Sequence, residues 1–370
     1  MTLFSKLFSG KSDEIGDDRY QEIIEQTLAN YRSESFPEGI LPVCRNLTVS
    51  SNKKQSTVAI TVPFPCVGEL QLIADNLSTS LAVQVNFKVS LDVKPVRAHR
   101  IKPVANIIAI ASGKGGVGKS TTTVNLAYAL MSEGAKVGIL DADIYGPSIP
   151  TMLGVQDDKP SSADGKLMQP IMKDDIASMS IGYLVDDSEA MVWRGPMASG
   201  AFGQLLNETA WPELDYLLID MPPGTGDIQL TLAQKVPVAG AVVITTPQDI
   251  ALADAQKGIV MFDKVKVPVL GIVENMSYHL CENCGHQSHL FGREGGKDIA
   301  ELNHVDLLGQ LPLDIAIRED GDLGESSIFK AQGSDLSNQY RKIARNIASK
   351  VFNELDMRSQ STPDVVIESK

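Results

Sequence analysis

A glycine-rich run from Gly113 to Thr121 carries the residue types that bind nucleotide phosphates. Its letters, GKGGVGKST, fit the pattern G-x-x-x-x-G-K-[ST] at every fixed position. The glycines allow backbone N–H groups to approach phosphate oxygens closely, because no side chain intervenes. We expect Lys119 to contact the β- and γ-phosphates of ATP and Ser120 to bind Mg²⁺. The predicted phosphate-binding residues are Gly113, Lys114, Gly115, Gly116, Val117, Gly118, Lys119, Ser120 and Thr121.

Three aspartates follow apolar runs and supply the acidic groups that phosphoryl transfer requires. Asp220 closes the run 216–219, which is typical of the residue that holds Mg²⁺ beside a phosphate loop. Asp141 and Asp143 follow the run 137–140, and we expect Asp143 to position the attacking water. Any one aspartate could instead cap a helix. Three of them beside a complete phosphate loop favour ATP hydrolysis, with Lys119, Asp143 and Asp220 as catalytic residues.

Cys281 and Cys284 form a C-x-x-C pair, which offers two thiolates to one metal ion or cluster. Two subunits could each give two thiolates and close an iron–sulfur cluster. Alternatively, His286 and His289 could complete a local Cys₂His₂ zinc site, at tighter spacing than a typical finger. A thiol redox pair and an inert surface loop are further possibilities. The spacing alone leaves all of these open.

The elements that must position these residues read as alternating strands and helices. The runs 107–111, 137–140, 178–184, 216–221, 241–245, 267–273 and 307–311 are nearly continuous apolar segments, as in parallel strands covered on both faces. Helical spacing indicates helices over 122–131, 248–264 and 336–351. We therefore predict an α/β fold with a doubly wound, mostly parallel sheet and ligand loops at the carboxyl ends of its strands.

A small α+β domain is predicted before this sheet. Helical spacing over 20–31 and 69–80 alternates with strand patterns over 57–62 and 81–89. Cys66 stands just before the second helix, where a thiol either has a lowered pKa or is packed and inert; we expect Cys44 to be inert. The expected boundaries are a tail (1–18), the small domain (19–93), a linker (94–104), the ATPase domain (105–355) and a second tail (356–370).

Composition indicates a protein of the reducing cytoplasm. The 370 residues have a formal charge of −13, which repels nucleic acid, and no long basic patch is visible. The chain contains four cysteines, too few for a disulfide framework. No apolar run approaches the roughly 18 residues of a membrane span. We therefore expect no nucleic-acid partner and no membrane partner.

Lys114 is a lysine that a simple phosphate loop does not need. With it, the loop resembles the deviant Walker A class, K-G-G-x-G-K-[ST]. In that class this lysine reaches the nucleotide of a partner subunit, so the resemblance implies a catalytic role for Lys114 in a nucleotide-sandwich homodimer. A MinD- or ParA-like positioning ATPase with a structural zinc site is the alternative within this class.

The chain carries a set of motifs in the segments 112–121, 141–148, 193–197, 215–227 and 274–277 and in the C-x-x-C pair. With these motifs, residues 106 to 329 resemble the Mrp/ApbC family of iron–sulfur cluster carrier ATPases. The resemblance implies a labile 4Fe–4S cluster, bound between two subunits by Cys281 and Cys284, that passes from an assembly scaffold to apo-protein clients. It also implies an adenine contact from Asn275, whereas Glu325 follows Gly324 where many members have proline. Residues 19–93 loosely resemble a MIP18-like domain.

Overall fold

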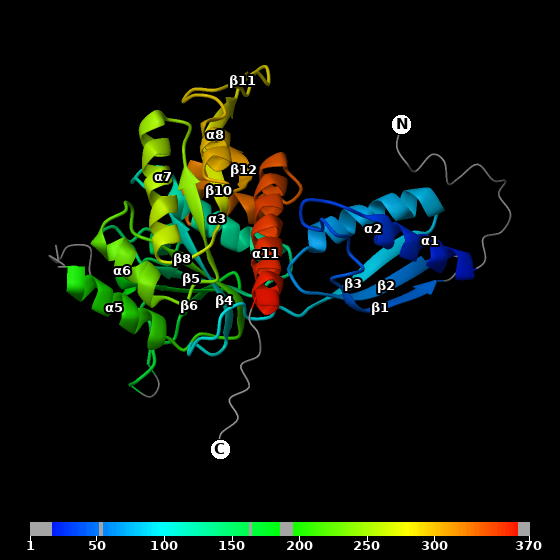
Figure 1. Cartoon of the computed structure of the whole chain (residues 1–370), viewed down its shortest axis with the longest axis horizontal. Coiled ribbons are helices and arrows are strands. Elements are labelled where there is room, and N and C mark those ends of the chain that lie inside the picture. Colours follow the sequence, from blue (N-terminus) through cyan, green and yellow to red (C-terminus); the bar gives the residue numbers. More distant parts are fainter. Residues whose placement is uncertain (1–16, 52–54, 163–164, 186–194, 362–370) are drawn as a thin grey trace. The chain divides into compact units, whose positions relative to one another are not determined.

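The structure is a computed structural model that describes residues 17–51, 55–162, 165–185 and 195–361. It divides into two compact units, of which the first ends at Asp92 and the second begins at Val93 (Figure 1). Within the described residues, no helix is long and apolar enough to cross a bilayer.

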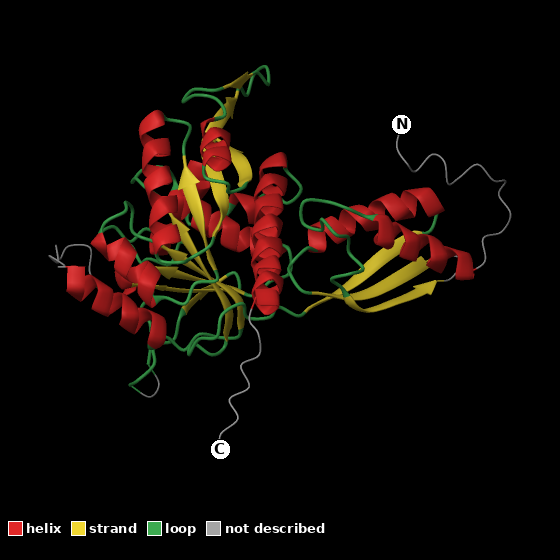
Figure 2. Ribbon diagram, viewed as in Figure 1, coloured by secondary structure: helices red, strands yellow, loops and turns green. Residues whose placement is uncertain are grey.

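The first unit is a small α+β layer pair. Helix α1 (Asp17–Asn30) precedes β1 (Arg45–Ser51) and β2 (Gln55–Val62), and helix α2 (Val67–Leu81) connects β2 to β3 (Gln84–Leu91). The sheet order is β1-β2-β3, with β1 antiparallel and β3 parallel to β2. Alternate residues of β2 are buried, and Figure 2 shows both helices against one face of the sheet.

Two predictions for this unit need correction. Strand β1 was not predicted, and the strand expected over 81–89 starts only at Gln84. Leu81 still belongs to α2, which ends because Ala82 adopts the left-handed conformation at φ 52°. The first residue of the predicted strand, Leu81, therefore belongs to the helix before it.

The second unit confirms the predicted α/β fold with a doubly wound, mostly parallel sheet. Its described strands follow the spatial order β12-β10-β9-β4-β8-β5-β7-β6. Strand β11 pairs with the last residues of β10. Only β6 and β11 pair antiparallel with their neighbours in this part of the chain. The strands are β4 (Val104–Ala111), β5 (Val137–Asp141), β6 (Ile171–Lys173), β7 (Ile176–Ser180), β8 (Leu214–Asp220), β9 (Gly240–Thr245), β10 (Val269–Leu280), β11 (Gln287–Ser288) and β12 (Leu307–Pro312).

Helices cover both faces of this sheet. Helices α5 (Gly195–Asn207), α6 (Asp227–Lys235), α7 (Asp249–Lys264) and α8 (Gly295–Leu302) pack successively against one another. Helix α3 (Lys119–Ser132) packs instead with α11 (Asp335–Ser361) and with the short helices α4 (Ile149–Met152) and α10 (Ser327–Lys330); α9 (Ile315–Leu323) packs on α4. Right-handed crossovers explain why the helices lie on two faces of the sheet. Helix α3 connects β4 to β5 in one direction along the sheet, whereas α6 and α7 connect β8 to β9 and β9 to β10 in the opposite direction.

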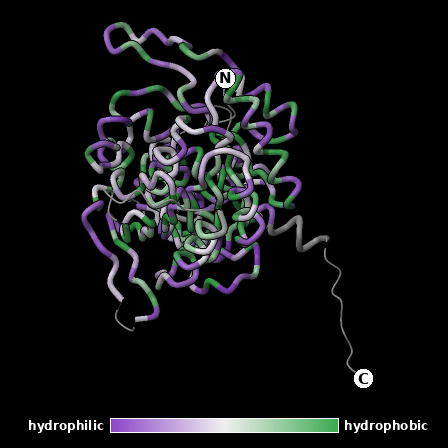
Figure 3. Tube along the Cα trace, turned by 90° about the vertical axis from the view of Figure 1, so that its left-hand side faces the viewer, coloured by the Kyte–Doolittle hydropathy of each residue, from purple (hydrophilic) through white to green (hydrophobic). Residues whose placement is uncertain are grey.

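The core of the second unit lies between these layers. Strands β5 and β9 are buried at every position, as the continuous apolar runs predicted. Figure 3 shows hydrophobic stretches in the interior and hydrophilic residues on many outer turns. This rigid sheet fixes the loops that leave its carboxyl edge.

Some element boundaries differ from the prediction. The segment 178–184 is not one strand: β7 ends at Ser180, whose hydroxyl accepts a hydrogen bond from Gly182 N (3.0 Å) and starts a 3₁₀ turn over Ile181–Tyr183. Strand β10 continues past residue 273 to Leu280, and α11 continues past residue 351 to Ser361.

Candidate functional site

The phosphate loop joins β4 to α3 at the carboxyl edge of the sheet. Gly116 and Gly118 both have φ of +81°, a conformation that glycine adopts without strain. In the neighbouring strands, Asp220 is in register with both Ile110 and Asp141. The predicted loop and acidic residues are therefore brought together by strand pairing.

Asp220 is the centre of a buried hydrogen-bonded cluster. Its Oδ2 accepts from Lys119 Nζ (2.6 Å) and from Ser120 Oγ (2.6 Å), and its Oδ1 accepts from Thr123 Oγ1 (2.7 Å). Asp220 is fully buried, and Lys119 is 6% exposed. A buried carboxylate needs compensation, which the amine of Lys119 and the two hydroxyls supply.

Thr123 is a member of this cluster that the sequence prediction missed. It lies one helical turn after Lys119, whose carbonyl also accepts a hydrogen bond from its hydroxyl (3.0 Å). The i, i+4 spacing from Lys119 was visible in the sequence, but a threonine in an apolar helix gives no separate signal of function.

The oxygen donors of this cluster fit a magnesium ion. Ser120 Oγ and the Asp220 carboxylate are hard ligands on adjacent elements, and Mg²⁺ is usually held by one or two carboxylates together with substrate phosphates. Among the described side chains, no group of three or more His, Cys, Asp or Glu is placed to hold a metal ion by itself.

Asp141 ties together three segments beneath this cluster. It is fully buried and accepts hydrogen bonds from Asp143 N (3.1 Å), Ser180 Oγ (3.0 Å) and Ile149 N (3.4 Å). Burial, and next the negative charge of Asp220, raise the pKa of Asp141 to about 8. Burial thus favours the neutral form of Asp141 more than in an exposed aspartate, and its hydrogen bonds make it a positioning group.

Asp143 is partly buried on the loop that Asp141 anchors. Burial raises the pKa of Asp143, and Lys119 opposes this rise. Backbone N–H groups of Tyr145 and Gly146 also favour its charged form. The structure thus places Asp143 within the electrostatic reach of both Lys119 and Asp220.

Lys114 is exposed at the tip of the loop. Its carbonyl accepts a hydrogen bond from Ser112 Oγ (2.9 Å), and its amine has no ion-pair partner among the described residues. The preceding Gly113 lies against helix α7, where an added Cβ would come 2.1 Å from the carbonyl oxygen of Asp254. These contacts fix the backbone at Gly113 and Lys114, while the Lys114 side chain remains exposed to solvent.

Asn275 contacts the phosphate loop directly. Its Nδ2 donates to Val117 O (2.9 Å), and the side chain is 6% exposed. A Cβ on Gly118 would meet this Nδ2 at 2.2 Å, so the two segments are in close contact. This contact joins residues 158 positions apart, and sequence reasoning did not find it.

The C-x-x-C pair lies in the turn between β10 and β11. Cys281 N donates to His286 O (3.0 Å), and Gly285 N donates to Cys281 O (2.8 Å). Cys284 is exposed and Cys281 is partly exposed. Backbone N–H groups of Cys284 and Asn283 lower the pKa of Cys281, which favours the thiolate that binds metals.

The two histidines of the zinc alternative differ in their surroundings. His286 is exposed. The Nδ1 atom of His289 lies 3.0 Å from Ser277 O. Because a carbonyl only accepts, this nitrogen carries the proton, and Nε2 then accepts from Gln287 Nε2 (3.3 Å).

The remaining sequence features have structural explanations. Cys66 is fully buried at the start of α2, and burial raises the pKa of the partly exposed Cys44. At the departure from the family pattern, Gly324 (φ +69°) packs on Gly154, and Ser326 caps α10 by accepting from Ile328 N (3.2 Å).

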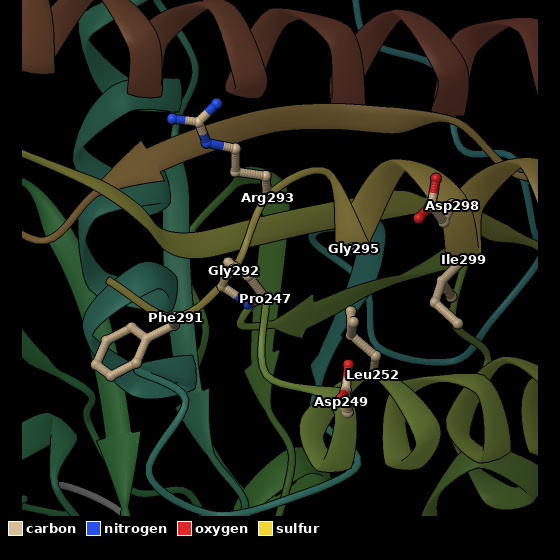
Figure 4. A pocket seen from close by; sticks show the side chains of 9 residues that line it. All are labelled: Pro247, Asp249, Leu252, Phe291, Gly292, Arg293, Gly295, Asp298 and Ile299. Atoms are coloured by element: carbon tan, nitrogen blue, oxygen red, sulfur yellow. The ribbon is translucent and has the colours of Figure 1, made fainter. Parts of the chain in front are cut away.

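A separate cavity of about 420 Å³ lies between α7 and the start of α8 (Figure 4). None of the predicted site residues lines it. Apolar side chains of Leu252 and Ile299 line its interior, and charged groups stand around it. Its full lining is Pro247, Asp249, Leu252, Phe291, Gly292, Arg293, Gly295, Asp298 and Ile299.

Comparisons with known proteins show the family of this chain. Residues 103–348 match the model of the ParA family described as NUBPL iron-transfer P-loop NTPase. The iron-sulfur cluster carrier proteins of Salmonella typhimurium and Escherichia coli K12 are each 51% identical, over 90% and 89% of this chain and 93% and 92% of theirs. The mouse iron-sulfur cluster transfer protein NUBPL is 48% identical over 68% of this chain and 79% of its own.

One solved structure shows the same P-loop NTPase fold. A nucleotide-binding protein from Archaeoglobus fulgidus, in complex with ADP, is 41% identical and superposes with a TM-score of 0.54. The match covers 61% of this chain and 88% of the other. This likeness shows the fold and leaves the roles of the individual site residues to experiment.

Proposed function

Because the chain belongs to the NUBPL iron-transfer P-loop NTPase family, we propose that it is an ATP-hydrolysing iron–sulfur cluster carrier. It binds a labile 4Fe–4S cluster through Cys281 and Cys284 of two copies and transfers it from an assembly scaffold to apo-proteins. The observation that carries the proposal is the exposed thiol pair at the end of β10, the strand that also contacts the phosphate loop.

The ATPase chemistry follows from the Asp220 cluster. Lys119, which now contacts Asp220, would bind the phosphates of ATP, while Ser120 and Asp220 would hold Mg²⁺. The bound magnesium would neutralise phosphate charge. Asp143 positions the attacking water, and Asn275, beside the loop, contacts the adenine. Lys114 extends to the nucleotide of a second copy, which makes hydrolysis a property of the homodimer.

The cluster is cargo, and the thiol pair suits cargo that must leave. One chain supplies two thiolates, half of what a 4Fe–4S cluster requires, so a second copy completes the site. An exposed turn lets a client approach the cluster, whereas a permanent cluster would be enclosed. We place this carrier in the cytoplasm, without a nucleic-acid or membrane partner.

Anaerobic reconstitution with iron and sulfide tests the carrier function. We expect one 4Fe–4S cluster per dimer, and we expect Cys281→Ser and Cys284→Ser each to abolish it because two ligands per dimer are lost. Cys44→Ser is the matched control, since that thiol lies in the other compact unit, and it should retain the cluster. A cluster that persists in the Cys281→Ser/Cys284→Ser double variant would refute the assignment.

The second candidate is a MinD- or ParA-like positioning switch with a structural zinc site. The protonation of His289 at Nδ1 favours it, because a metal-binding histidine commonly donates its other nitrogen to a carbonyl. Metal and sulfide analysis of anaerobically purified protein separates the two functions. Zinc without sulfide, lost on replacing His286 as well as either cysteine, would support the switch.

A further inference from the structure

Strand β10 contains an irregular segment between the phosphate loop and the thiol pair. Glu274 pairs with Gln310 of β12, and Tyr278 pairs with Pro312, so four steps along β10 match two along β12. Met276, in the middle, has φ of +54°. A bulky residue in the left-handed region is strained, and such strain persists only where the surroundings enforce it.

The first half of this bulge is held by the phosphate loop. Asn275 donates to Val117 O, and Met276 also reaches the loop, since its Cε would lie 3.7 Å from a Cβ on Gly118. Gly118 is the N-cap residue, directly before the first residue of α3. Movement of the loop on binding nucleotide therefore acts directly on both residues.

The second half of the bulge is held by the thiol-bearing hairpin. Ser277 O accepts from His289 Nδ1, and His289 lies directly after β11, the return strand of the hairpin. The Ser277 hydroxyl is held in turn by the buried Glu274 carboxylate (2.6 Å). Three consecutive residues of one strand thus connect Val117 to His289.

We propose that the bulge at Asn275–Ser277 couples the nucleotide state of the phosphate loop to the conformation of the C-x-x-C hairpin, with His289 as the positioning residue at the hairpin end. The inference rests on the proposed function, because it assigns the route by which ATP acts on the cluster ligands. A strained joint suits this role, since packed, strained segments switch between discrete arrangements rather than deforming gradually.

Thiol alkylation of the metal-free chain tests the coupling without requiring a cluster. The rate at which iodoacetamide modifies Cys281 and Cys284 is followed by mass spectrometry, with and without a non-hydrolysable ATP analogue and Mg²⁺. We expect the analogue to change the wild-type rate about fivefold or more, the size of a typical coupling.

Three histidine variants isolate the contact. His289→Leu places a methyl group where Nδ1 stands and should abolish the response, whereas His289→Asn places an amide there and should restore it. His286→Leu is the matched control from the same hairpin and should respond like wild type. Met276→Gly, which removes the loop contact and tolerates φ of +54°, should weaken the response from the other end.

The outcomes separate this inference from the proposed function. An equal response in His289→Leu and wild type would come from burial in a dimer alone and would overturn the inference. A wild-type chain that binds the analogue without any change in alkylation would also overturn it, while leaving the carrier function to the reconstitution experiment. A chain that binds no nucleotide would overturn both.

Discussion

At the scale of single residues, the site is dominated by two carboxyl groups on paired strands. Asp220 is compensated by Lys119, whereas Asp141, in register with it, has no cation of its own in direct contact. Two adjacent buried charges repel, which adds to the effect of burial and raises the pKa of Asp141. The two carboxyl groups thus differ in their surroundings, because Asp220 has a cationic partner and Asp141 accepts from neutral donors.

The raised pKa of Asp141 predicts a pH-dependent stability. Between the unfolded pKa of about 3.8 and the folded pKa of about 8, the native chain binds more protons than the unfolded chain. The free energy of unfolding should therefore fall as pH rises from 4 to 8, by at least about 1 kcal/mol from this group. Urea unfolding across that range, followed by a probe in the second unit, measures the slope.

Asp141→Asn provides the comparison for this slope. It keeps the shape of the side chain but cannot titrate, so its stability should depend less on pH over the same range. Equal slopes in the variant and the wild type would contradict the assignment of a proton to Asp141.

At the scale of elements, the phosphate loop and β10 are fitted to each other. Gly116 and Gly118 share a φ of +81°, but only the position of Gly118 lies against Asn275. For Gly116, no atom lies within 4 Å of an added Cβ. Alanine variants at the two positions therefore separate the free-energy cost of the left-handed backbone from the cost of a steric clash with Asn275.

We predict that Gly118→Ala destabilises the protein more than Gly116→Ala. Both variants place alanine in the left-handed region, at about 1–2 kcal/mol each. Gly118→Ala must also displace the Asn275 amide, which breaks its bond to Val117. Thermal unfolding without nucleotide measures the stability of both variants. An equal loss of stability in the two would contradict the prediction, because it would mean that the Asn275 side chain moves away at no cost.

The sequence was sufficient where one strand or one motif carried the signal. Buried parallel strands such as β4 and β9 are long apolar runs, and the phosphate loop is contiguous. Strand β1 was missed because its residues RNLTVSS are mostly polar and lie at a sheet edge. The contacts of Asn275 and His289 depend on the bulge in β10, a tertiary feature that no local pattern records.

At the scale of the whole molecule, the proposed activity requires two copies. Lys114 is exposed, and its amine has no ion-pair partner in the described part of the chain. The thiol pair supplies half of the ligands of a 4Fe–4S cluster. In the proposed function, the pairing of two chains around nucleotide would complete both features at once.

We predict that Lys114→Ala lowers ATP hydrolysis by about tenfold or more while changing ATP affinity little, because the amine acts across the dimer in the transition state. Wild-type activity per chain should rise with protein concentration. Steady-state hydrolysis and equilibrium nucleotide binding measure the two effects. Equal activity per chain in an enforced monomer would exclude the intersubunit role.

The contacts of Asp220 have a consequence for how nucleotide and magnesium enter the site. Lys119 and Ser120 already have a partner in the carboxylate, so an incoming phosphate must compete with a group of the same sign. Under the proposed function, free ATP would displace only the lysine, whereas ATP carrying magnesium would offer a cation to the carboxylate and a phosphate to the amine at once. We therefore expect ligand entry to exchange one ion pair for another, and we expect the loop to discriminate against inorganic anions that arrive without a metal.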